Sequence, residues 1–244
     1  MMQVFIYNDA HSLGRGAAKI VSEAVMANPS LKLGFPTGST PIGMYAELVQ
    51  LHQRGRLSFN SAWAFNLDEY VGLAATSSQS YNHFMASNLF NHVDLPLEHR
   101  FIPDGMAASP EDEANRYDTL LAEHGPLDLL ILGIGTNGHI GFNEPGSAWD
   151  SPCRVVDLSE ETITANARFF TEEGEQVPKQ AITMGMAAIL SAKRILLLAM
   201  GSSKAACIRG ALQEPPTLEL PASALQGHSN LTVLLDKEAA AMLR

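Results

Sequence analysis

The stretch 127-LDLLILGIGTNGHIGFNEPG-146 joins an apolar run to a glycine-rich loop, and this junction decides the fold. The run from Leu127 to Leu132 is typical of a buried strand. The glycines of 133-GIGTNG-138 match a dinucleotide-binding string, but that kind of site needs a long helix directly afterwards. Pro145 and Gly146 limit any such helix. The segment therefore predicts a strand that opens into a glycine-rich loop without a bound nucleotide.

Leucine-rich or β-branched runs alternate with longer amphipathic stretches along the chain, which is typical of βαβ units. We expect strands at residues 4–7, 31–35, 62–66, 127–132, 194–199 and 231–235. We expect helices near residues 12–27, 41–53, 80–90, 110–123, 184–192, 203–212 and 237–243. The predicted fold is α/β: one domain over residues 1–244, with a doubly wound, mainly parallel sheet and helices on both faces. The least periodic region, residues 143–177, is expected to form a lid.

The composition excludes several classes of protein. The apolar runs are far shorter than the roughly 20 residues of a membrane-spanning helix, and the N-terminus lacks a signal peptide, so we expect a cytoplasmic protein without a membrane partner. Cys153 and Cys207 have no CxxC spacing and are expected to be free thiols. The formal net charge of -10, without any Lys/Arg run, argues against nucleic acid. It does not exclude a small anion, because distant charges are screened within about 10 Å.

Two predicted strand-to-helix junctions are suited to binding an anion. The loop 36-PTGSTP-41 offers the hydroxyls of Thr37, Ser39 and Thr40, with Thr40 as a helix N-cap and Pro41 as the first helical residue. This loop is not an ATP-type P-loop, and a capped helix after a tight turn is the structural alternative. The second junction, 200-MGSSK-204, places Lys204 in the first helical turn, where the helix dipole disfavours a cation unless an anion lies nearby.

Two other junctions carry groups that can move protons. The run 63-WAFNLDEY-70 ends in Asp68 and Glu69, whose side chains point to opposite faces if the strand continues through them, so only one can serve a pocket. A carboxylate there can remove a proton from carbon, whereas the structural alternative is a solvated strand end. The glycine-rich loop presents Asn137, His139 and Glu144, a combination suited to proton transfer at a hydroxyl or ring oxygen.

Five segments together resemble the glucosamine-6-phosphate deaminase family, also called the glucosamine-6-phosphate isomerase family. They are 36-PTGSTP-41, 66-NLDEYVGL-73, 135-GTNGHIGFNEPG-146, 165-ANARFF-170 and 201-GSSK-204. Their order and spacing agree with the family over nearly the whole chain. The resemblance implies deamination of glucosamine 6-phosphate to fructose 6-phosphate and ammonia, without a metal or other cofactor.

The resemblance also assigns roles to individual residues. It implies that Asp68 is the enolisation base and that the ring-opening group consists of Asn137, His139 and Glu144. The sugar-phosphate contacts that it implies are Thr37, Gly38, Ser39, Thr40, Arg168 and Lys204, with Arg168 carried on the lid. The short C-terminal tail is similar to the short form of the family. Regulated relatives carry a basic residue where this chain has Val156, which argues against control by N-acetylglucosamine 6-phosphate.

Three other functions are compatible with parts of this pattern. A 6-phosphogluconolactonase shares the fold and a histidine loop, but the LDEY and FNEPG strings do not suit it. Galactosamine-6-phosphate isomerase is closer, although the ANARFF segment favours the glucosamine enzyme. A non-enzymatic sugar-phosphate sensor would have no use for Asp68 and His139 in one cleft. The chain is expected to act on a small sugar phosphate as a monomer or a homo-oligomer.

Overall fold

The computed structural model of the chain describes residues 2–167, 170 and 176–244. Within them, a seven-stranded sheet has the order β1-β10-β9-β6-β2-β3-β5, and its strand pairs are parallel. Its strands are β1 (Gln3–Tyr7), β2 (Lys32–Phe35), β3 (Trp63–Asn66), β5 (Arg100–Phe101), β6 (Leu129–Leu132), β9 (Ile195–Ala199) and β10 (Leu231–Asp236). The six predicted strands are confirmed, and within this sheet only the two-residue β5 was not predicted.

A smaller antiparallel sheet lies beside the main one and has the order β4-β8-β7. Its strands are β4 (Asp68–Tyr70), β7 (Arg154–Asp157) and β8 (Gln180–Thr183). Sequence patterns missed all three, because these strands form by pairing between segments that are far apart in the chain, which local periodicity does not report. One of them, β7, falls in the region predicted to be irregular, and β8 begins three residues after it.

The helices are α1 (Ala10–Ala27), α2 (Ile42–Gln53), α3 (Tyr81–Asn88), α4 (Pro110–His124), α5 (Glu160–Asn166), α6 (Met186–Ser191) and α7 (Ala205–Gln213). Short 3-10 turns are η1 (Phe90–His92), η2 (Leu97–His99), η4 (Ser202–Lys204) and η5 (Pro221–Gly227). None of the helices in the described residues is long and apolar enough to cross a membrane. Six predicted helices are confirmed within a few residues, and α5 was not predicted.

Two predictions at helix ends were wrong. Residues 237–242 form turns, in which the Asp236 carboxylate accepts the N–H of Ala239 at 2.7 Å. Thr40 is not the cap of α2, since Pro41 occupies that position without a side-chain cap bond. The carbonyl of Pro41 accepts the N–H of Tyr45 at 3.0 Å, so the helix begins at Ile42.

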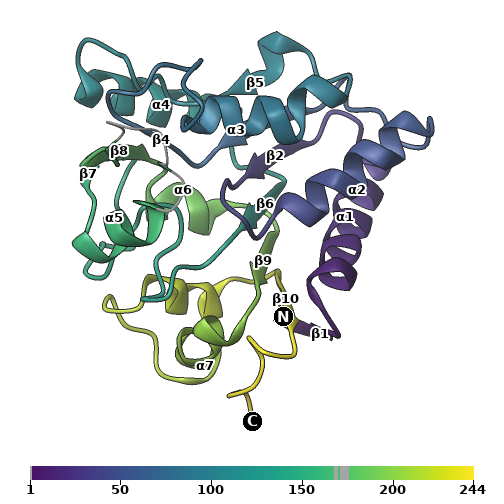
Figure 1. The fold of residues 1–244 in the computed structure, drawn as a ribbon, viewed down its shortest axis with the longest axis vertical. Helices are drawn as coiled ribbons and strands as arrows, with labels where there is room; N and C mark the ends of the chain where they lie inside the picture. The colour runs from purple at the N-terminus through teal and green to yellow at the C-terminus, as the bar shows by residue number, and fades with distance from the viewer. Residues whose placement is uncertain (1, 168–169, 171–175) are drawn as a thin grey trace.

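Both faces of the main sheet are covered, as the doubly wound fold requires. Alternate residues of β9 enter different cores: Ile195 and Leu197 pack with α4, α6 and α7, whereas Leu196 and Leu198 pack with α1, α2 and α3. Figure 1 shows α1 and α2 side by side along one flank of the sheet. The predicted fold class is confirmed.

The strand order places a ligand-binding edge between β2 and β6. The chain leaves β2 outward to β3 and β5, then returns to pair β6 with the other side of β2. Loops that leave two such strands in opposite directions leave a crevice between them, where open α/β sheets bind ligands. The 36–41 loop follows β2 and the glycine-rich loop follows β6, so they meet at this crevice.

Candidate active site

A cavity of about 420 Å³ lies at this crevice. The predicted site residues that line it are Thr37, Gly38, Ser39, Thr40, Asp68, Asn137, His139 and Lys204. Glu144 contacts His139 rather than lining the cavity. Arg168 lies outside the described residues. Loops that are distant in sequence therefore bring predicted phosphate contacts and predicted proton-transfer groups to one cavity.

Two loops with hydrogen-bond donors or cations line the cavity. Gly38 has a φ of 90°, a backbone conformation that side chains disfavour, so the turn after β2 depends on glycine there. Lys204 ends the 3-10 turn η4 and directly precedes α7. The N–H of Gly201, at the start of that loop, donates to the Asp236 carboxylate at the end of β10. The second loop is thereby fixed to the sheet and holds Lys204 at the cavity.

Asp68 and Glu69 face different surroundings, as strand alternation predicted. The Glu69 carboxylate turns away from the cavity and accepts the N–H groups of Tyr70, Tyr81 and Asn82, each at 2.9 Å. These bonds join β4 to the start of α3, which gives Glu69 a structural role. Asp68 lines the cavity.

The pKa of Asp68 is raised to about 8, first because burial disfavours the charged form and then because the Glu69 charge lies nearby. Burial also raises the pKa of Glu69 to about 7, against the opposing effect of its backbone hydrogen bonds. A carboxyl group whose pKa is raised at a cavity wall is, once ionised, a stronger base than an ordinary carboxylate, which suits it to accepting a proton there.

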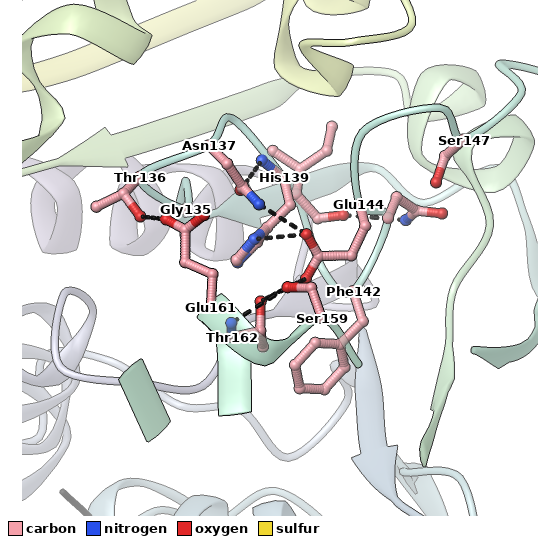
Figure 2. A network of polar contacts seen from close by, with 12 residues as sticks. Gly135, Thr136, Asn137, His139, Phe142, Glu144, Ser147, Ser159, Glu161 and Thr162 are labelled. Atoms are coloured by element: carbon pink, nitrogen blue, oxygen red, sulfur yellow. Dashed lines mark hydrogen bonds and ion pairs between the residues drawn. The ribbon is translucent and has the colours of Figure 1, made fainter. Parts of the chain in front are cut away.

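His139, Asn137 and Glu144 form one polar cluster in the glycine-rich loop (Figure 2). The amide of Asn137 donates to Glu144 Oε2 at 2.7 Å, and its Oδ1 accepts the backbone N–H of His139 at 3.2 Å. His139 Nδ1 lies 3.7 Å from Glu144 Oε2, which is an ion-pair separation longer than a hydrogen bond. A Cβ on Gly135 would lie 2.3–2.5 Å from three atoms of the His139 ring, so only glycine leaves room for the imidazole.

The Glu144 carboxylate is strongly stabilised in its charged form. Partial burial alone would raise its pKa, but contacts with His139, Thr162 and Asn137 outweigh that effect and lower the pKa to about 2. Glu144 therefore stays negative over the working pH range and can stabilise a positive charge on His139. The cluster is suited to passing a proton through His139 with Glu144 as the charged partner.

Sequence reasoning missed several residues at the cavity. Tyr81 is half-buried at its wall and lies nearly parallel to the Phe142 ring, with centroids 6.0 Å apart. From α5, Thr162 bonds to Glu144, and Glu161 accepts a hydrogen bond from Thr136 at 2.8 Å. Ser159, followed by two acidic residues in the first turn, was a recognisable helix start. No sequence signal separates Tyr81 from an ordinary core aromatic residue.

A family model described as glucosamine-6-phosphate isomerases/6-phosphogluconolactonase matches residues 8–234. The chain belongs to this family. Two curated relatives, both named glucosamine-6-phosphate deaminase, come from Thermoanaerobacter sp. (strain X514) and Lachnoclostridium phytofermentans. The first is 43% identical over 242 residues, covering 99% of this chain and 95% of the relative. The second is 47% identical over 233 residues, covering 96% of this chain and 98% of the relative.

Solved structures agree with the observed architecture. A monomeric glucosamine-6-phosphate deaminase matches with a TM-score of 0.96 at 45% identity, covering 99% of this chain and 100% of its own. A 6-phosphogluconolactonase from Trypanosoma brucei matches with a TM-score of 0.79 at 22% identity, covering 100% of this chain and 99% of its own. The second likeness shows a shared fold alone. The family predicted from the five sequence segments is confirmed.

Proposed function

We propose that this chain is a glucosamine-6-phosphate deaminase, which converts glucosamine 6-phosphate and water to fructose 6-phosphate and ammonia. The observation that carries the proposal is the meeting of Asp68 with His139 in one cavity beside two loops suited to a phosphate. Relatives with that name are 43% and 47% identical over nearly the full chain. Asp68 and His139 supply a base for carbon and a proton carrier for oxygen, and an aldose-ketose conversion needs both.

Phosphate binding sets the position of the sugar. The proposed contacts are the hydroxyls and N–H groups of the 36–41 loop and the ammonium of Lys204, both at the cavity wall. Arg168 remains a further proposed contact from the proposed lid, residues 143–177. A phosphate held at one end of the cavity fixes the distance and orientation of the sugar carbons relative to the proton-transfer groups. Each proton transfer then becomes an effectively unimolecular step.

Ring opening is the first proposed step. His139 takes the proton from the anomeric hydroxyl and a proton is delivered to the ring oxygen, so that the bond between C1 and the ring oxygen breaks and C1 becomes an aldehyde. The positive charge that His139 carries in between is stabilised by Glu144, 3.7 Å from Nδ1. Asn137 fixes the Glu144 carboxylate by its 2.7 Å hydrogen bond. Proton transfer by a positioned group contributes roughly 10²–10⁴-fold.

Asp68 carries the second step. Its carboxylate takes the proton from C2 while the C1 oxygen gains a proton and the C2 ammonium loses one, which gives a neutral enolamine. Asp68 then returns its proton to C1, so that C1 becomes CH2OH and C2 becomes an iminium. Water adds to C2 and ammonia leaves, which gives the ketone. The substrate itself favours the active form of the base, because its C2 ammonium brings a positive charge to a carboxyl whose pKa is about 8. The steps are proton transfers, cleavage of the bond between C1 and the ring oxygen, addition of water and loss of ammonia, and the proposal includes no metal or other cofactor.

The test is the release of ammonia and fructose 6-phosphate from glucosamine 6-phosphate by the purified chain. Galactosamine 6-phosphate and 6-phosphogluconolactone serve as comparison substrates, since an isomerase for the first and a hydrolase for the second are the alternatives. Faster turnover of either comparison substrate would reject the proposal. We also propose that the protein is a monomer and acts in the cytoplasm. A solved relative that is 45% identical is described as monomeric, which supports the proposed oligomeric state.

A further inference from the structure

The Glu144 carboxylate is held from two sides, and only one of them belongs to its own loop. Oε2 accepts the Asn137 amide at 2.7 Å and lies 3.7 Å from His139 Nδ1. Oε1 instead accepts hydroxyl groups from the start of α5: Thr162 Oγ1 donates to it, and Ser159 Oγ lies at 3.2 Å. Figure 2 shows the carboxylate between these two sets of partners. Its plane is therefore fixed only while both sets are present.

Thr162 is the stronger of the two donors on the α5 side. A hydroxyl has one proton. The Ser159 hydroxyl has two acceptors in reach, Glu144 Oε1 at 3.2 Å and Thr162 Oγ1 at 3.1 Å, and it also accepts the N–H of Thr162 as the helix cap. Thr162 makes the shorter contact with Glu144. The Thr162 side chain thus supplies the main donor to Oε1.

The position of Thr162 is itself well defined. Its side chain is buried at 4% exposure, and the next residue, Ile163, packs against the cluster formed by Tyr70 and Phe142. At the far end of α5, the amide of Asn166 donates to the hydroxyl of Tyr70 at 2.8 Å. Packing and polar contacts therefore set α5 against the smaller sheet, and the hydroxyl of residue 162 has a fixed place from which to hold Glu144.

We propose that the Thr162 hydroxyl is a positioning group that sets the Glu144 carboxylate against His139, so that ring opening depends on a hydroxyl at residue 162. This inference rests on the proposed function. Thr162 acts through Glu144 and not on the reacting atoms. The terminal torsion of a glutamate side chain is broad, so a carboxylate fixed at one oxygen can turn away from its partner.

The experiment compares Thr162→Val, which keeps the shape without the hydroxyl, with Thr162→Ser, which keeps the hydroxyl. In Thr162→Val, kcat for glucosamine 6-phosphate should fall about 10-fold while KM changes less than about 2-fold, because a hydrogen bond to a charged group is lost and Ser159 retains only its longer contact. Thr162→Ser should keep kcat within about 3-fold of the parent. The matched control is Thr164→Val, the same change at an exposed position of α5, which should match the parent.

Crystal structures of the parent and Thr162→Val provide a readout that does not depend on activity. The Glu144 carboxylate should leave its place against Asn137 and His139 in the variant. If the carboxylate stays in place, or if Thr162→Val turns over within about 2-fold of an active parent, the inference is wrong and the proposed function stands. If the parent releases no ammonia, the proposed function fails, and the two crystal structures still decide whether Thr162 positions Glu144.

Discussion

Replacing Asp68 with asparagine should make the protein more stable and inactive at the same time. The pKa of Asp68 is about 8 in the folded chain against an ordinary value of 3.8, because of burial and then the Glu69 charge. The difference, 8 minus 3.8, is about 4 units, and at about 1.36 kcal/mol per unit it corresponds to a cost of at most about 5–6 kcal/mol.

The sign follows from the raised pKa. Below about pH 3.8 the group is protonated in both the folded and unfolded chain and costs nothing. As the pH rises toward about 8, the folded chain must retain a proton that the unfolded chain has released, so the cost grows and then levels off. Asparagine resembles the protonated acid at every pH. Asp68→Asn should therefore be several kcal/mol more stable than the parent near pH 8 and nearly equal to it near pH 4.

Urea unfolding at these two pH values, together with ammonia release, measures both effects. Asp128→Asn is the matched control, because the Asp128 carboxylate accepts Lys193 Nζ at 2.7 Å and its pKa is lowered despite its partial burial. That control should lose stability at the higher pH. Equal stabilisation of Asp68→Asn at both pH values would refute the assigned burial cost. Near-normal ammonia release by Asp68→Asn would refute its role as the base.

Other substitutions test the remaining assignments. Glu144→Gln should lower kcat/KM by roughly 10²-fold or more, because the charged partner of the proton carrier is lost; activity like that of the parent would make Glu144 structural. In Asn137→Asp, a second carboxylate replaces the amide that donates to Glu144. The two carboxylates should then share a proton up to a higher pH, so the acid limb of the pH profile of kcat/KM should move to higher pH; a limb that does not move would contradict this. Lys204→Ala should raise KM more than it lowers kcat, whereas an unchanged KM, with unphosphorylated glucosamine competing equally, would reject the phosphate contact. Velocity curves should be hyperbolic with or without N-acetylglucosamine 6-phosphate, since Val156 replaces a basic residue; sigmoidal curves that this compound makes hyperbolic would overturn the expectation.

The main sheet could be predicted because its strands are encoded locally. The run before the glycine-rich loop is apolar at every position of β6, and the amphipathic helices between strands are long enough to show their period. The smaller sheet and α5 could not be predicted in this way. The strands of that sheet have three or four residues and exist because β8 pairs with β4 and β7, which come from distant parts of the chain.

The predicted site shows the same division. Strand alternation indicated that Asp68 and Glu69 face apart, but the choice between them depended on the backbone N–H groups at the start of α3, which capture Glu69. The sequence segments implied that His139 works with Glu144. They carried no sign that Thr162, eighteen residues further along, bonds to the same carboxylate.

The sequence by itself determined the α/β class, the glycine-rich loop and the residue types that the chemistry requires, because periodicity and turn chemistry act over a few residues. Only the tertiary structure decided which loops meet. The pairing of β6 with β2 brings His139 to the same cavity as Gly38, about a hundred residues earlier in the chain. It also decided the pKa values, because burial raises that of Asp68, and the folded placement of His139, Thr162 and Asn137 around Glu144 lowers that of Glu144. Solvation and charge depend on every group within reach in space, and the order of residues along the chain does not specify those neighbours.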